Sequence, residues 1–161
     1  MPAGRPVRIC VVGRGECGPD LEELARRVGA EIAGRGAVLV CGGLGGVMEA
    51  ACRGALEADG LTVGILPGES ASDANSAVVV PLPTGMGEAR NVINVRTGDA
   101  VIALEGGFGT LSEVALALKM GKPVVAVGAW KDIEGVTVAD GPQEAVDAAL
   151  RLAERSARDE R

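Results

Sequence analysis

A glycine-rich segment past the middle of the chain has the residue types that bind anions. Gly106, Gly107 and Gly109 follow the apolar run at residues 99–104, and Thr110 comes directly after them. Glycine allows the backbone to approach a ligand closely, and the free amides of a helix's first turn, together with a hydroxyl group, favour a phosphate. We therefore expect these three glycines and Thr110 to bind the phosphate of a small molecule.

Two further glycine-rich segments follow apolar runs and predict other parts of the same site. Residues 13–18 read G-R-G-E-C-G, and residues 41–49 read C-G-G-L-G-G-V-M-E. A tight strand-to-helix turn explains the first segment about equally well, and a flexible turn alone is the alternative for the second. The ligand-binding residues expected here are Gly13, Arg14, Gly42, Gly43 and Gly45.

The spacing of these glycines argues against the common nucleotide cofactors. Residues 13–18 match G-x-G-x-x-G, but the dinucleotide fingerprint also needs an acidic residue near the end of the second strand, where this chain has Cys41-Gly42-Gly43. The other two segments lack the G-K-[ST] ending of a Walker A loop. We therefore expect no bound cofactor of these kinds and no triphosphate hydrolysis.

Two charged residues near the glycines are candidates for catalysis. Glu113 follows Thr110 at the spacing of a capping box, so the alternative role for its carboxylate is to accept a backbone hydrogen bond at the start of a helix. The alternative for Arg90 is an exposed, solvated side chain. From the residues alone, both alternatives stay open.

The composition excludes several classes of site. The chain has no histidine, which removes Ser-His-Asp and Cys-His nucleophiles, imidazole bases and His-based zinc sites, and we expect no metal. Its four cysteines include no C-x-x-C pair, and no secretory segment is evident at the start, which predicts a reduced, cytoplasmic protein with Cys17 as the candidate reactive thiol.

Charge and aromatic content limit the expected partners. The formal net charge is −6, and the chain has one Trp, one Phe and no Tyr, so a nucleic-acid partner is not expected. Phe108 is expected either to contact the ligand or to pack in the core. No apolar run reaches the length of about 18 residues that a membrane-spanning helix needs, so no membrane partner is expected.

Alternating strands and helices are expected to position these residues. The predicted strands cover residues 7–13, 37–41, 62–66, 77–80, 99–104, 123–127 and 136–138, and the predicted helices cover residues 19–34, 47 to about 60, 85–97, 110–120 and 142–155. Such alternation predicts a single Rossmann-like α/β domain at residues 1–155, with a mostly parallel sheet and helices on both faces. Residues 156–161 are expected to form a frayed, charged tail.

Three motifs together resemble a known family. They are the Gly-Gly turn at residues 42–46, the G-x-G-E-A-R-N segment at residues 85–91 and the G-G-F-G-T-L-S-E turn at residues 106–113. The combination resembles the LOG-like family once called lysine decarboxylases, which includes cytokinin-activating phosphoribohydrolases and molybdenum cofactor carrier proteins. Decarboxylation is not expected, since no Schiff-base context surrounds Lys119, Lys122 or Lys131.

The resemblance implies roles for individual residues. In the phosphoribohydrolases the corresponding turn and Arg segment read P-G-G-x-G-T-x-x-E and M-x-x-R-K, so Arg90 and Glu113 would be the catalytic pair and the turn would hold the 5′-phosphate. Two departures, Glu105 for the Pro and Asn91 for the Lys, resemble the shorter branch that contains the cofactor carriers.

These observations predict the binding of a nucleoside 5′-monophosphate or a similar phosphorylated molecule, with hydrolysis of its N-glycosidic bond as a further expectation. The alternative is a carrier that holds molybdenum cofactor, a pterin phosphate, without turnover. The family and the Ala- and Leu-rich helices also predict a homodimer.

Overall fold

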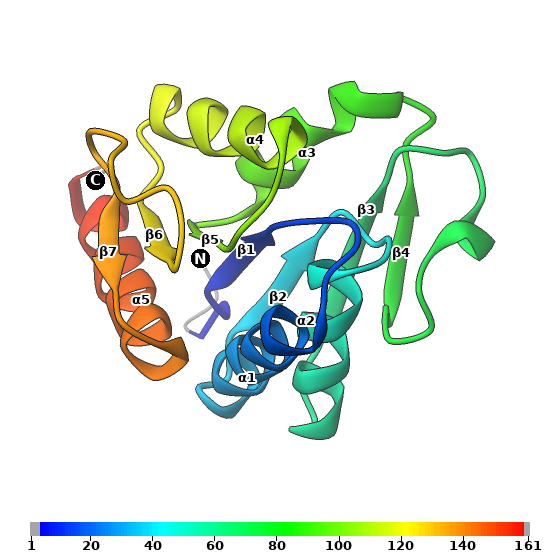
Figure 1. Ribbon diagram of the computed structural model, residues 1–161, viewed down its shortest axis with the longest axis horizontal. Coiled ribbons are helices and arrows are strands. Elements are labelled where there is room, and N and C mark those ends of the chain that lie inside the picture. The colour runs from blue at the N-terminus through cyan, green and yellow to red at the C-terminus, as the bar shows by residue number, and fades with distance from the viewer. Residues whose placement is uncertain (1–3, 160–161) are drawn as a thin grey trace.

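Seven parallel strands form one sheet in the order β4-β3-β2-β1-β5-β6-β7 in the computed structural model, which describes residues 4–159 (Figure 1). The strands are β1 (Arg8–Val12), β2 (Val38–Cys41), β3 (Thr62–Leu66), β4 (Val80–Pro83), β5 (Ala100–Ala103), β6 (Val124–Val127) and β7 (Thr137–Ala139). The helices are α1 (Pro19–Gly34), α2 (Val47–Glu57), α3 (Arg90–Thr97), α4 (Phe108–Lys119) and α5 (Pro142–Asp159), with 3-10 turns η1 (Ala71–Asp73) and η2 (Gly87–Ala89). The predicted α/β class is confirmed, and every strand pair is parallel.

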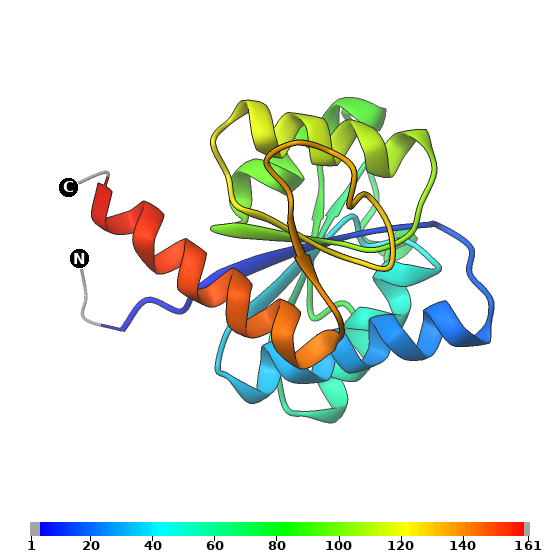
Figure 2. The ribbon, with the colours of Figure 1, turned by 60° about the vertical axis from the view of Figure 1, so that its left-hand side comes forward.

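Helices cover both faces of the sheet, with α1, α2 and α5 on one face and α3 and α4 on the other (Figure 2). Side chains alternate along each strand. In β1, Ile9 and Val11 pack in the core beneath α1, α2 and α5, whereas Cys10 and Val12 pack toward α3 and α4. Both sets are buried, which explains why the strands are continuous apolar runs.

The strand order reverses between β1 and β5. From β1 the chain adds strands outward on one side as far as β4, and β5 begins a second series on the other side of β1. The chain leaves β1 toward α1 on one face and leaves β5 toward α4 on the opposite face. In open α/β sheets, this divergence creates a crevice at the carboxyl ends of the two strands, where ligands bind.

The fourth strand differs from its prediction. Prolines were expected to end it at residue 80, but β4 runs from Val80 to Pro83 and includes both Pro81 and Pro83. The amide of Thr84 donates to the Leu66 carbonyl of β3, so by alternation the nitrogens of residues 81 and 83 face the open edge of the sheet. Proline is tolerated there because no ladder hydrogen bond is lost, and it hinders the addition of another strand.

Two helix boundaries also differ from their predictions. Gly85 and Gly87 have φ values of +63° and +58°, so a regular helix cannot begin at residue 85, and α3 starts at Arg90 after η2. The frayed tail is wrong for residues 156–159, which contain no helix breaker and continue α5 to Asp159. Residues 160 and 161 lie outside the described residues. Within the described part of the chain, no helix is both long and apolar enough to cross a membrane.

Candidate functional site

A cavity of about 440 Å³ opens at the carboxyl ends of β1 and β5, where the strand order reverses. Segments from all three glycine-rich turns line it, together with the start of α3. Eight of the eleven predicted site residues line the cavity: Gly13, Arg14, Gly42, Arg90, Gly107, Gly109, Thr110 and Glu113.

The other three predicted residues, Gly43, Gly45 and Gly106, lie beside the cavity lining rather than in it. A Cβ atom on Gly106 would lie 2.0 Å from the Thr110 hydroxyl oxygen, and one on Gly43 would lie 2.6 Å from Leu66. A Cβ atom on Gly45 would lie 3.1 Å from the backbone oxygen of Gly15. In the structure these glycines permit close packing of the turns around the cavity.

Backbone hydrogen bonds hold the three turns together at Arg14. Its amide donates to the Glu105 carbonyl at 2.9 Å, and its own carbonyl accepts from the Val47 amide at 2.9 Å. Gly46, with φ of +62°, passes so close to the Arg14 carbonyl that a Cβ atom would lie 2.3 Å from it. Segments far apart in the sequence are therefore joined in one rim around the cavity.

The Arg14 side chain is exposed at this rim and pairs with Glu105. One guanidinium nitrogen lies 3.3 Å from a Glu105 carboxylate oxygen, and 50% and 60% of the two side chains are exposed. An ion pair this open to water contributes little stability, so Arg14 can exchange Glu105 for an anionic ligand at low cost. Glu105, one of the two departures from the hydrolase motif, thus pairs with Arg14, a residue that was predicted to bind the ligand.

Arg90 is buried, so the alternative of an exposed, solvated side chain is wrong. Its Nε donates to the Ile65 carbonyl at 2.8 Å, its Nη2 to the Gly42 carbonyl at 3.3 Å and its Nη1 to Asn91 Oδ1. Three of the five guanidinium N–H groups are thereby engaged within residues 4–159, which leaves two for a ligand. A Cβ atom at position 42 would lie 2.6 Å from Arg90 Nη2, so a larger residue there would displace the Arg90 side chain.

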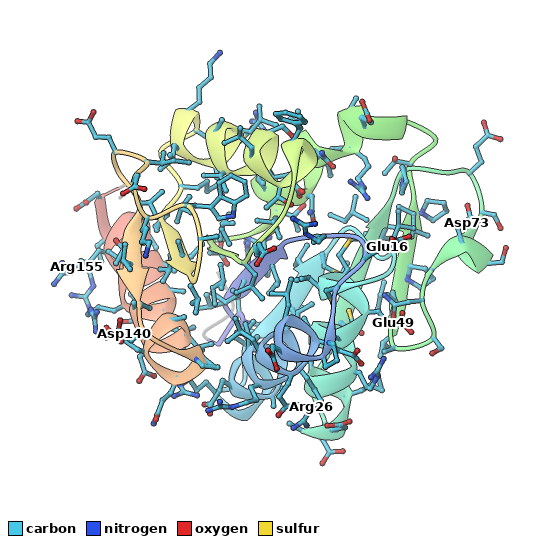
Figure 3. The ribbon with its side chains drawn as sticks, viewed as in Figure 1. Glu16, Arg26, Glu49, Asp73, Asp140 and Arg155 are labelled. Atoms are coloured by element: carbon cyan, nitrogen blue, oxygen red, sulfur yellow. The ribbon has the colours of Figure 1, made fainter. Side chains whose placement is uncertain are left out.

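The environment of Arg90 differs from that of the surface arginines. Arg26 on α1 forms ion pairs with Glu23 and Glu57, and in Figure 3 Arg26 and Arg155 lie at the outside of the molecule. Arg90 is instead held by two backbone carbonyls and an amide oxygen, none of which neutralises its charge. A buried cation with neutral partners creates a positive potential in the cavity.

Glu113 lies in the cavity wall, and the capping alternative is wrong. The helix α4 begins at Phe108 with Gly107 as its N-cap, so Glu113 is too far along the helix to reach back to the cap. Its carboxylate accepts a hydrogen bond of 2.7 Å from Asn94 Nδ2. Burial raises the pKa of Glu113 to about 7, although the Asn94 hydrogen bond and the Arg90 charge act in the opposite direction.

The start of α4 presents backbone amides that have no hydrogen-bond partner among residues 4–159. The first intrahelical hydrogen bond at this end runs from the Leu111 amide to the Gly107 carbonyl, so the amides of residues 108–110 precede it. Gly107 and Gly109 line the cavity here, and the space where their Cβ atoms would lie is open. Free amides, small residues and the positive end of the helix dipole make this position suitable for an anion.

Two residues were misjudged or missed from the sequence. Asn94 lines the cavity and binds Glu113, and its position one helical turn after Arg90 was the available signal. Two alternatives were expected for Phe108, and the one that packs it in the core is wrong, because the residue is 90% exposed. Phe108 is also not among the residues that line the cavity.

Comparison with known proteins agrees with the motifs. The model of the SLOG cluster4 family matches residues 6–154. The chain belongs to the SLOG cluster4 family. The predicted resemblance to LOG-like proteins is thereby confirmed.

Solved structures and curated relatives that resemble this SLOG protein include molybdenum cofactor proteins and phosphoribohydrolases. It is 40% identical to the molybdenum cofactor binding protein from Rippkaea orientalis, with a TM-score of 0.87 over 91% of this chain and 97% of that one. It is 36% identical to the molybdenum cofactor carrier protein from Chlamydomonas reinhardtii, with a TM-score of 0.82 over 93% and 99%. A cytokinin riboside 5′-monophosphate phosphoribohydrolase from Mycobacterium tuberculosis is 38% identical over 73% of this chain and 67% of that protein.

Proposed function

We propose that this SLOG protein binds a small phosphorylated molecule in the cavity between β1 and β5. The observation that carries this proposal is that the free amides at the start of α4 and the buried Arg90 guanidinium border one cavity of about 440 Å³. The phosphate would bind at Gly107, Gly109 and Thr110, and Arg90 would balance its charge with the two N–H groups left for a ligand. Arg14 would add a second cation at the rim.

Molybdenum cofactor, a pterin phosphate, is the ligand that the relatives favour, as a cargo held without turnover. Two solved relatives named for this cofactor match the chain over 97% and 99% of their own lengths, whereas the phosphoribohydrolase match spans 67% of that protein. Glu105 and Asn91, the departures from the hydrolase motif, point the same way.

Hydrolysis of a nucleoside 5′-monophosphate is the second candidate, favoured by the presence of Arg90 and Glu113 in one cavity. Cleavage of the N-glycosidic bond passes through an oxocarbenium-like ribose, which a nearby carboxylate stabilises while it orients the attacking water. Glu113 in its ionised form would have that role. Arg90 would neutralise the phosphate or assist the departing base.

Mass spectrometry of the small molecule that co-purifies with the protein tests the proposal. A pterin phosphate is the expected result.

The second candidate is tested by chromatography after incubation with AMP, GMP, CMP and UMP, with the unphosphorylated nucleosides as controls. Release of free base from a monophosphate, but not from its nucleoside, would replace the carrier by a hydrolase, and Glu113→Gln should then abolish turnover while sparing affinity. If the protein holds no phosphorylated molecule and binds none, binding itself is refuted.

A further inference from the structure

Helix α3 buries three polar side chains within its eight residues. Arg90 and Asn91 are 8% exposed and Asn94 is 1% exposed, and all three line the cavity. Burying polar groups costs free energy unless hydrogen bonds compensate for the lost water. Arg90 has three partners and Asn91 accepts from Arg90, so Asn94 is the member of this set whose role is not yet accounted for.

Asn94 uses only one end of its amide. Its Nδ2 donates to Glu113 Oε2 at 2.7 Å, whereas its Oδ1 is buried and has no hydrogen-bond partner among residues 4–159. A leucine of similar size at this position would itself carry no polar atom to leave unsatisfied. A fixed hydrogen bond from Nδ2 to Glu113 therefore does not explain why the side chain at this position also carries a buried, unpaired oxygen.

The two ends of an amide match the two protonation states of a carboxyl group. An ionised carboxylate only accepts hydrogen bonds, whereas a protonated carboxyl also donates one. If the Asn94 amide turns by half a rotation about its last side-chain bond, Oδ1 takes the place of Nδ2 and faces Glu113 as an acceptor. The same side chain then provides a partner for either state.

We propose that Asn94 is a positioning residue that holds the Glu113 carboxyl group in the cavity wall in both of its protonation states. It offers its amide nitrogen to the carboxylate and its amide oxygen to the protonated acid. A ligand of either charge would therefore meet a Glu113 side chain in the same place. The part of this inference that concerns the ligand rests on the proposed function, whereas the pairing itself does not.

The surroundings of Glu113 make both states accessible. Burial raises its pKa to about 7, and the opposing influences are the Asn94 hydrogen bond and the charge of Arg90. The other titratable neighbours are the thiols of Cys10 on β1 and Cys41 on β2, which interact electrostatically with Glu113, while the charged Arg14 and Glu88 lie elsewhere along the cavity. Of these groups, Asn94 alone donates a hydrogen bond to the carboxylate.

Nuclear magnetic resonance on the unmodified protein without ligand tests the pairing directly. The Glu113 carboxyl carbon and the Asn94 side-chain amide should shift with a common midpoint between about pH 5 and pH 9. Comparison with Glu113→Gln identifies the carboxyl signal, and the same change should abolish the pH response of the amide. An Asn94 amide signal that does not follow the Glu113 titration would overturn the proposal.

Substitution of Asn94 tests the direction of the effect. Asn94→Leu removes the donor to the carboxylate, so the Glu113 midpoint should rise by about one pH unit. Thr97→Val is the matched control, because Thr97 lies on the same helix and its hydroxyl donates to Ile93 rather than to Glu113. A midpoint in Asn94→Leu equal to that of the unmodified protein would contradict the proposal. If this variant does not fold, the titration of the unmodified protein still decides.

The test of the Asn94–Glu113 pairing can be separated from the test of ligand binding. Calorimetry with a nucleoside monophosphate or a pterin phosphate measures ligand binding, and the titrations above need no ligand. Binding without coupling between Asn94 and Glu113 would refute this inference alone. Coupling without binding of any phosphorylated molecule would refute the proposed function and leave the pairing intact.

Discussion

Glu113 differs from most glutamates in that it is buried, and among the described residues its carboxylate accepts a hydrogen bond from the Asn94 amide. The residue is 8% exposed, and burial raises its pKa from 4.5 to about 7. Such a group titrates near neutral pH, in the range that suits a proton donor or acceptor and a site that must accept an anion. The glycine residue at position 42 and the carbonyl of Ile65 keep Arg90 close enough to moderate this pKa without forming an ion pair.

Protonation of Glu113 should make stability depend on pH. Because its pKa is higher in the folded state, the folded protein binds the proton more tightly, and the contribution of Glu113 to stability declines as pH rises from about 4.5 to about 7. Glu113→Gln lacks this decline. Relative to the unmodified protein, the variant should therefore gain on the order of 3 kcal/mol between pH 4.5 and pH 8.

Urea unfolding of both proteins at a series of pH values measures this difference. The gain should develop mainly between about pH 5 and pH 7 and then level off. Parallel pH profiles for the two proteins would show that burial does not disfavour the charged form of Glu113.

At the scale of the elements, two glycines allow α1 and α2 to pack in direct backbone contact. A Cβ atom on Gly29 would lie 1.8 Å from the Ala51 carbonyl oxygen, and one on Gly54 would lie 1.8 Å from the Arg26 carbonyl oxygen. The contact is reciprocal, since each glycine faces the backbone of the other helix. This packing fixes the position of α2, whose first residue Val47 donates its amide to Arg14 at the cavity rim.

Gly29→Ala should destabilise the protein by about 2–3 kcal/mol or more, because the added methyl group has no space between the helices. Gly34→Ala is the matched control on the same helix, where a Cβ atom would meet nothing within 4 Å. That change should be neutral or stabilising by up to about 1 kcal/mol, because alanine favours helices over glycine. Chemical unfolding measures both effects. If Gly29→Ala is as stable as Gly34→Ala, the close helix contact is wrong.

Helices and strands could be predicted from the sequence where apolar residues recur without interruption. They were harder to predict where the local backbone geometry sets their ends. Buried strands such as β1 and β5 were found as apolar runs. The position of β4 was missed because proline was taken to end strands, whereas at a sheet edge its missing amide costs nothing. Convergence of the glycine turns was predictable from parallel strands, but the link from Asn94 to Glu113 depends on how α3 packs on α4, which no spacing in the sequence fixes.

At the scale of the whole molecule, the exposed apolar side chains bear on assembly. Phe108 is 90% exposed and Leu111, one helical turn later on α4, is 37% exposed. Large apolar side chains exposed in this way commonly mark contact surfaces. We propose that a second copy of the chain covers this part of α4 in a homodimer.

Analytical ultracentrifugation tests the homodimer and its location. The unmodified protein should sediment with twice the monomer mass, and Phe108→Asp should shift it toward the monomer. Leu61→Asp, at a side chain that is 44% exposed outside α4, should leave the dimer unchanged. A monomer at all concentrations would refute the homodimer. Equal effects of the two substitutions would refute the proposed location of its interface on α4.

The proposed anion site lies in a chain of formal net charge −6. The overall charge of the protein would repel an anion. Backbone amides, the α4 dipole and the Arg90 side chain would therefore have to attract it locally. The central claim is therefore that a phosphate group binds at the start of α4, and Gly109 is the position at which it can be tested with least disturbance of the fold.

Calorimetric titration with a phosphorylated ligand, a nucleoside monophosphate or the pterin phosphate, tests that claim most directly. A Cβ atom on Gly109 would meet nothing within 4 Å, so Gly109→Ala and Gly109→Asp should both fold. Gly109→Asp should lower affinity roughly tenfold or more, because its carboxylate would oppose the phosphate at the positive end of the helix, whereas Gly109→Ala should change it much less. Equal affinity of the folded Gly109→Asp variant and the unmodified protein would contradict the account.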